Sequence, residues 1–168
     1  MSSEHELSEV RRLKGEKNQI KNTIKEFNTV EKPLKLLKKL IDRGIFSKKN
    51  AASEIAEFLH RYNKRLNHVN IGVLIGDYDP LAIEVRDIFI EKMGFKGHLV
   101  DEGLRILLRY FTIPGESQVV ERIIDCFSKA YFHQNAETAF HHSDAVYSFS
   151  YLLMMLQTNL HNPQVQES

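Results

Sequence analysis

The chain has 168 residues, of which 42% are apolar and 27% are charged. That length is enough for one domain with a continuous core, and the composition excludes a disordered or fibrous protein. A single cysteine, Cys126, excludes a disulfide framework and a multi-cysteine metal site, which is typical of a reducing compartment such as the cytosol. The N-terminal segment is too charged for a signal peptide, and no window is apolar for long enough to span a membrane.

The net charge of +1 is unevenly distributed, because the N-terminal third of the chain is basic. Residues 1–50 carry thirteen Lys or Arg and seven Asp or Glu, a net charge of +6, whereas residues 51–168 carry a net charge of −5. A basic segment can lie against an acidic surface, but a solvated helix face is the commoner explanation. Because the basic residues are not interleaved with stacking aromatic residues, the pattern disfavours nucleic acid as a partner.

The first third of the chain has apolar residues at helical spacing. Residues 1–26 predict a long solvated helix, and residues 34–41 predict a short amphipathic helix that ends before Gly44. Residues 53–59 predict a third helix, with Ser53 as its N-terminal cap.

The helical pattern continues through the middle of the chain. Residues 70–74 predict another short helix, and residues 83–93 predict one with Ile83 facing inward and Arg86 on its polar side. No segment alternates with the period of a strand. The predicted fold class is therefore all-α, a domain of many short helices without internal repeats.

Three stronger helical patterns follow. Residues 99–111 and 120–131 predict two packed helices that are joined through the sequence Pro-Gly-Glu. Residues 144–156 predict a helix that is apolar nearly all the way round. Such a helix is either central to the core or offers one flank as an open groove, and the sequence leaves both interpretations open.

Motifs for catalysis and metal binding are incomplete. Ser117 lies in a sequence that begins like a nucleophile elbow, but Val119 replaces the final glycine and a helix precedes it instead of a strand. Residues 77–79 resemble the start of a calcium loop, but Pro80 follows and Ile88 occupies the place of the bidentate glutamate. Several late histidines lack the spacing of zinc ligands, so no metal site is predicted: His133, His141, His142 and His161. The chain shows no machinery for covalent chemistry.

Three segments together resemble the Sec7 domain, the exchange-factor domain for Arf GTPases. They are FTIPGESQVVER at residues 111–122, DAVY at 144–147 and MMLQTNLHNPQV at 154–165. The combination of P-G-E-x-Q with L-H-N-P is specific, and P-G-E-S-Q-x-x-E-R is similar to the large Golgi-associated subfamily. Shorter likenesses lie upstream at Phe27-Asn28, residues 54–60, Ile71-Gly72 and residues 100–108.

The resemblance implies a single Sec7-like domain, a right-handed array of about eight to ten short helices in three parts. The charged helix of residues 1–26 would precede a helical subdomain over residues 27–98. Residues 99–168 would form the hydrophobic groove, and the domain would be truncated where family members usually continue through further C-terminal helices.

The resemblance also implies a function and a partner. The chain would be a guanine-nucleotide exchange factor that stimulates GDP release from an Arf-family small GTPase, without covalent chemistry. No cofactor of its own is implied, because GDP, GTP and Mg²⁺ belong to the GTPase. It would act in vesicle-mediated transport from the cytoplasm, peripheral to Golgi or endosomal membranes, with association through the basic N-terminal segment or other regions. The alternative is a non-catalytic helical module that binds Arf.

By family position Glu116 is the glutamic finger, which enters the nucleotide site, disfavours Mg²⁺ and the β-phosphate and offers the P-loop lysine a substitute anion. Pro114 and Gly115 suit the two central places of a type II turn, which would hold Glu116 on a rigid tip. From the sequence alone, the favoured interpretation is that Glu116 merely caps the helix that follows, and the family resemblance reverses that order. The partner-binding residues implied by the resemblance are Ile113, Pro114, Gly115, Gln118, Glu121, Asp144, Tyr147, Tyr151, Leu152, Met155, Thr158, Asn159 and Asn162.

The sequence departs from the family pattern near these positions. Thr112-Ile113 replaces the common Arg-Leu before Pro-Gly-Glu, and Glu121-Arg122 replaces the common Asp-Arg. Tyr151-Leu152 and Asn159 differ from the residues that accompany brefeldin A sensitivity, which predicts weak sensitivity.

Overall fold

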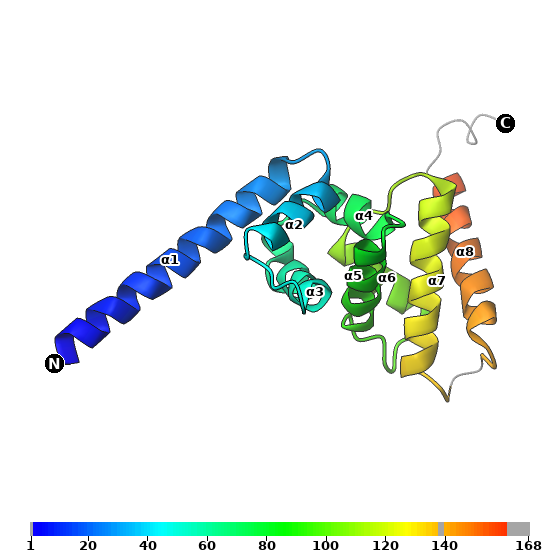
Figure 1. Cartoon of the computed structure of the whole chain (residues 1–168). Coiled ribbons are helices and arrows are strands. Elements are labelled where there is room, and N and C mark those ends of the chain that lie inside the picture. The colour runs from blue at the N-terminus through cyan, green and yellow to red at the C-terminus, as the bar shows by residue number, and fades with distance from the viewer. Residues whose placement is uncertain (1, 138–139, 161–168) are drawn as a thin grey trace.

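The computed structural model describes residues 2–137 and 140–160, with side chains from residue 4 to residue 157 within those ranges. Over these residues it contains eight α-helices, one 3₁₀ turn and no strand, which confirms the predicted fold class. The elements in chain order (Figure 1) are α1 (Ser2–Thr29), α2 (Pro33–Asp42), α3 (Ala51–Arg61), the 3₁₀ turn η1 (Asn63–Arg65), α4 (His68–Gly76), α5 (Pro80–Glu91), α6 (Val100–Tyr110), α7 (Ser117–Gln134) and α8 (Ser143–Leu160).

The long helix α1 belongs to the core only at its C-terminal end. Its first half projects away from the other helices in Figure 1, and Leu7, Val10 and Leu13 there are exposed. Its last two turns bury Ile24 and Phe27, and the Phe27 ring packs edge to face on a phenylalanine of α3 with ring centroids 6.4 Å apart. The predicted solvated helix is therefore confirmed, and hydrophobic packing holds only its base.

Two asparagine side chains fasten the end of α1 to the start of α4. The Asn28 amide donates to the Arg65 carbonyl (2.8 Å) and its oxygen accepts from the Asn67 backbone N–H (2.7 Å). The Asn70 amide donates to the Phe27 carbonyl (2.7 Å). These bonds use backbone groups that the helix ends leave unpaired, so they orient α1 on the rest of the molecule.

Residues 77–79, which resemble the start of a calcium loop in sequence, form the turn before α5, and Asp79 caps that helix. Asp79 is the N-cap residue of α5, and its carboxylate accepts from the Leu81 backbone N–H (3.0 Å). The Lys38 ammonium of α2 lies 2.6 Å from the same carboxylate, and this hydrogen bond lowers the pKa of Asp79 below its ordinary value. The pair therefore joins α2 to the N-terminus of α5.

The predicted cap of α3 is wrong. The helix begins at Ala51 with Asn50 at the N-cap position, so Ser53 lies within its first turn. Ala51 and Ala52 are both buried, and their packing extends the helix N-terminal to the serine.

The predicted orientation of α5 is also wrong in part. Arg86, predicted on the polar side, is buried, and its guanidinium donates to the carbonyls of Ile75 (3.0 Å) and Asp77 (3.3 Å). Ile83, predicted to face inward, is 36% exposed. Arg86 can be buried because it satisfies carbonyl groups at the C-terminal end of α4. The core face of α5 is instead formed by Ala82, Val85, Phe89 and Ile90.

Helix α7 lies between α5 and α8 and carries the site described below. It buries Ile123, Ile124 and Phe127, and the Phe127 ring meets Phe95 edge to face at 5.0 Å between centroids. Helix α8 runs antiparallel to α7 along its outer side (Figure 1). The predicted pair of packed helices around Pro-Gly-Glu corresponds to α6 and α7.

Candidate functional site

The segment between α6 and α7 is extended. Phe111 has φ −165° and ψ 166°, and Glu116, the N-cap residue of α7, has φ −75° and ψ 126°. A type II turn needs a positive φ at its second central residue. Gly115 has no such φ, so the predicted type II turn is wrong. The chain instead bends at Gly115 without a positive φ and enters α7 at Ser117.

The extended segment is seated on α4. The Thr112 backbone N–H donates to the carbonyl of His68 at the start of α4 (3.1 Å). Gly72, one turn further along α4, lies so close to the segment that a Cβ atom would overlap the Thr112 carbonyl oxygen and approach Pro114 Cδ to 3.2 Å. Only a residue without a side chain permits this contact. Helix α4 therefore fixes the position of the segment that leads to Glu116.

A second glycine of α4 supports the start of α7. A Cβ atom at Gly76 would overlap the Val119 side chain. The Arg122 guanidinium donates to the Gly76 carbonyl, and its carbon lies 5.9 Å from the centre of the Tyr78 ring. Gly72 and Gly76 are four residues apart and therefore share one face of the helix. The spacing of the two glycines in the sequence IGVLIG could have predicted a close backbone contact on this face of the helix, but it was not used as a signal.

The Glu116 side chain is exposed at this supported position. Its backbone carbonyl accepts from the N–H groups of Val119 (3.0 Å) and Val120 (3.1 Å), which begin α7. Its carboxylate makes no capping bond, and no hydrogen bond or ion pair links it to any residue in the described part of the chain. The interpretation of the Glu116 side chain as a helix cap is therefore wrong, and the charge is free to meet another molecule.

Glu116 borders a shallow hollow of about 670 Å³. Two other predicted residues, Pro114 and Gln118, line the same hollow. The opposite wall comes from α4 and the loop after it, which the sequence analysis did not predict as part of a site: Val73, Gly76, Asp77 and Tyr78.

A second group of predicted residues meets along the seam between α7 and α8. The rings of Tyr147 and Tyr151 stack with centroids 5.9 Å apart and an angle of 20° between their planes. Partial burial raises the pKa of Tyr147, and the negative charge of Glu121 on α7 raises it further. Glu121 and the two tyrosines therefore share one surface. Leu152 of α8 is 55% exposed and lies about 100° round the helix from Tyr151.

The remaining predicted residues are spread more widely. Ile113 lies half-buried on the extended segment, Gly115 is exposed and Met155 is half-buried on α8. Because α8 is antiparallel to α7, Asp144 lies at the far end of the seam from Glu116, where its carboxylate is 3.2 Å from the His142 ring nitrogen. The side chains of Thr158 and Asn159, and the whole of Asn162, lie outside the described residues.

Over residues 2–137 and 140–160, no group of three or more His, Cys, Asp or Glu is placed to hold a metal ion. Within the same ranges no helix is both long enough and apolar enough to cross a membrane.

Comparison with known proteins gives consistent matches. The Sec7 domain family model matches residues 16–168. ARF guanine-nucleotide exchange factor 2 of Saccharomyces cerevisiae is 41% identical over 151 residues, which are 82% of this chain and 10% of that protein. Brefeldin A-inhibited guanine nucleotide-exchange protein 1 of Mus musculus is 33% identical over 155 residues, 92% of this chain and 8% of that protein. The chain thus spans a tenth or less of the length of these curated relatives.

Solved structures agree with the sequence matches. A structure of ARF1-GDP bound to a Sec7 domain complexed with brefeldin A has a TM-score of 0.75 and 38% identity, covering 93% of this chain and 76% of that chain. The Sec7p catalytic domain has a TM-score of 0.73 and 31% identity, covering 85% of this chain and 76% of that chain. With the family model matching from residue 16 onward and the helical fold in agreement, this chain belongs to the Sec7 domain family.

Proposed function

We propose that this chain is a guanine-nucleotide exchange factor that stimulates GDP release from an Arf-family GTPase, with Glu116 as the charged group that enters the nucleotide site. The observation that carries the proposal is the exposed Glu116 carboxylate, which has no bond in the described structure while its backbone is seated on α4. The proposal is supported by relatives named as ARF exchange factors and by the solved complex of a Sec7 domain with ARF1-GDP.

The proposed action of Glu116 is electrostatic. A small GTPase holds its nucleotide through phosphate contacts with a P-loop lysine and a Mg²⁺ ion. A carboxylate about 4 Å from a phosphate charge repels it by about 4 kcal/mol at an effective dielectric constant of about 20. That repulsion corresponds to about three decades in nucleotide affinity. The same carboxylate gives the lysine an anionic partner once the phosphate has left, and no covalent bond forms or breaks.

Repulsion by one carboxylate is not enough to release a tightly bound nucleotide. A nucleotide held with picomolar affinity is bound by about 16 kcal/mol, so most of that energy must come from elsewhere. An exchange factor supplies it by binding more tightly to a GTPase conformation that holds the nucleotide weakly. The proposed binding surface is the seam between α7 and α8, with the residues Gln118, Glu121, Tyr147, Tyr151, Leu152 and Met155.

The direct test is release of fluorescently labelled GDP from a panel of Arf-family GTPases, with the 168-residue chain added in catalytic amount. We expect faster release from at least one member of the panel. Binding to a GTPase without acceleration of release from any of them would favour the alternative, a non-catalytic Arf-binding module. Absence of both binding and release would contradict both functions.

The surface of α8 is tested by Leu152→Glu. Because Leu152 is 55% exposed in the free chain, the variant should fold normally. Burial of a leucine side chain at an interface contributes about 1.5–3 kcal/mol, so GTPase binding should weaken by about tenfold to a hundredfold. Binding is measured by titration calorimetry. The control is Leu13→Glu, an equivalent change at a leucine of α1 that is 52% exposed, and equal loss in both variants would contradict the proposed surface.

A further inference from the structure

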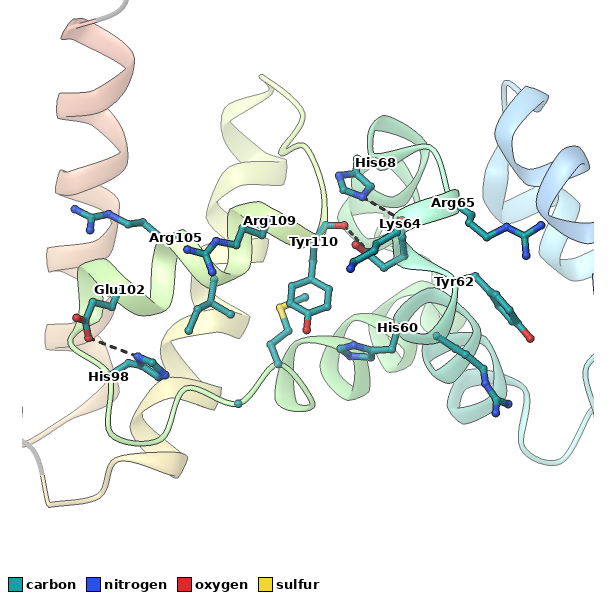
Figure 2. A pocket seen from close by; sticks show the side chains of 15 residues that line it. His60, Tyr62, Lys64, Arg65, His68, His98, Glu102, Arg105, Arg109 and Tyr110 are labelled. Atoms are coloured by element: carbon teal, nitrogen blue, oxygen red, sulfur yellow. Dashed lines mark hydrogen bonds and ion pairs between the residues drawn. The ribbon is translucent and has the colours of Figure 1, made fainter.

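A second cavity, of about 1290 Å³, lies in another part of the molecule (Figure 2). Its walls come from the end of α3, from η1, from the start of α4 and from one face of α6. None of its lining residues borders the hollow beside Glu116. The mechanism proposed above makes no use of this cavity.

The lining of the cavity is strongly basic. Its charged residues are one glutamate and five cations: Glu102, Arg61, Lys64, Arg65, Arg105 and Arg109. Glu102 is already placed 3.5 Å from His98, and Arg105 lies 3.5 Å from Asp101. The other four cations form no ion pair with any residue that the structure describes. The lining residues carry five positive charges and one negative charge, an excess of +4. Asp101 beside Arg105 and Glu57 near Arg61 offset part of this excess, and Lys64, Arg65 and Arg109 have no ion pair in the described part of the chain.

The cations come from three elements: Arg61 ends α3, and the others lie in η1 and α6, which are bonded to each other. Lys64 lies in η1, and Arg105 and Arg109 lie four residues apart on one face of α6. The Asn63 amide of η1 donates to the carbonyl of Tyr110, the last residue of α6 (2.8 Å). Figure 2 shows Lys64 and Arg109 on either side of Tyr110. The two groups of cations are thus held around one concave space.

Helix dipoles explain only part of this arrangement. Arg61 and Arg109 lie in the last turns of α3 and α6, where a cation interacts favourably with the unpaired carbonyl groups. That effect acts on each helix end separately, and it does not account for Arg105 in the middle of α6. A concave surface lined by one sign of charge focuses the electrostatic potential and attracts ions of the opposite sign.

We propose that this cavity binds an anion that carries two or more phosphate groups, such as an inositol polyphosphate, either free or as the headgroup of a lipid. Guanidinium groups recognise phosphate oxygens with paired, charge-assisted hydrogen bonds, and an ammonium group binds them as a point charge. Several cations spread over three elements match several phosphates better than one. The volume of the cavity is also larger than a single phosphate requires.

A ligand in this cavity would lie at the base of the segment that carries Glu116. It would contact η1 and the last turn of α6, and the segment follows directly after Tyr110. The segment is also bonded to the start of α4 through Thr112 and His68, and His68 lines the cavity.

The binding test is titration calorimetry with inositol hexakisphosphate. We expect saturable binding to the unmodified chain, weakened by about tenfold or more in the double variant Lys64→Glu with Arg109→Glu, because two attractions become repulsions. The matched control is Lys48→Glu with Lys49→Glu, which changes the net charge equally at exposed lysines outside the cavity. All four residues are exposed, and circular dichroism checks that helix content is kept.

The outcomes of this test are distinct. Absence of saturable binding, or an equal loss in both double variants, would overturn the proposal. Amide chemical shifts in the unmodified chain give an independent readout, and the ligand should move those of η1 and the last turn of α6. Vesicles of phosphatidylcholine with phosphatidylinositol bisphosphate identify the source, since binding to them assigns a lipid headgroup and binding to the free polyphosphate alone assigns a soluble ligand. Equal binding to vesicles with phosphatidylserine of the same charge would overturn the requirement for multiple phosphates.

Discussion

Glu116→Lys is expected to abolish stimulated GDP release while the chain still binds its GTPase. The substitution replaces a carboxylate that would repel the phosphates with an ammonium group that would attract them. Loss of about 4 kcal/mol of repulsion alone lowers release by about three decades. Release of labelled GDP gives the rate, and calorimetry with the nucleotide-free GTPase gives the affinity.

The fold should be indifferent to this substitution. The Glu116 carboxylate makes no capping bond, so the variant should lose only the contribution of an anion at a helix N-terminus, about 0.3–1 kcal/mol, and its thermal midpoint should fall only slightly. The control is Glu84→Lys, the same change at an exposed residue of α5, which should leave release and binding unaltered. Release by the Glu116→Lys chain at the normal rate would exclude Glu116 as the group that enters the nucleotide site.

Gly72→Ala is expected to impair both stability and exchange. A methyl group at this position overlaps the Thr112 carbonyl oxygen, which is backbone and cannot rotate away as a side chain would. Overpacking of this kind destabilises a protein by about 1–3 kcal/mol. The extended segment must also shift, and a displacement of about 1 Å at a reacting group can lower a rate about a hundredfold. Urea unfolding and GDP release measure the two effects.

The control for this variant is another glycine-to-alanine change within a helix. Gly15 lies in the exposed part of α1 with no atom near the position of an added Cβ. Gly15→Ala should therefore favour the helix by up to about 1 kcal/mol and leave exchange unchanged. If Gly72→Ala behaved like Gly15→Ala in both measurements, the segment would not be seated on α4 as described.

The helices themselves were predictable because their signal is local. The apolar stripe of residues 99–111 follows the helical period, and α6 forms there with Leu104 and Leu107 buried. The apolar pattern of residues 144–156 left open whether the helix is central or offers one flank, and α8 is buried on one side, at Val146 and Ser150, and exposed on another, at Leu152. The local spacing of apolar residues thus predicted where the helices lie, but it did not predict which side of each helix is exposed.

What the sequence analysis did not predict depends on contacts between distant segments. Arg86 resembles a surface residue of α5, but its partners are carbonyl groups at the end of α4. Gly115 lacks the positive φ of the type II turn that Pro-Gly by itself favours, and Thr112 and Pro114 before it pack against Gly72 of α4. Lys64 and Arg109 both line the basic cavity although they are far apart in the sequence, so no local sequence pattern predicts it.

The side-chain amides of Asn28 and Asn70, at the C-terminal end of α1, help to set the position of its distant N-terminal end. A helix of 28 residues is about 42 Å long, and only its last turns are packed on the other helices. Such a rod acts as a lever, because a tilt of about 10° at its base moves its tip by about 7 Å. The direction of the lever is set where Asn28 and Asn70 bond across the junction of α1 and α4. The position of a partner bound at the N-terminal end of α1 would therefore depend on the bonds of Asn28 and Asn70 at the opposite end of the helix.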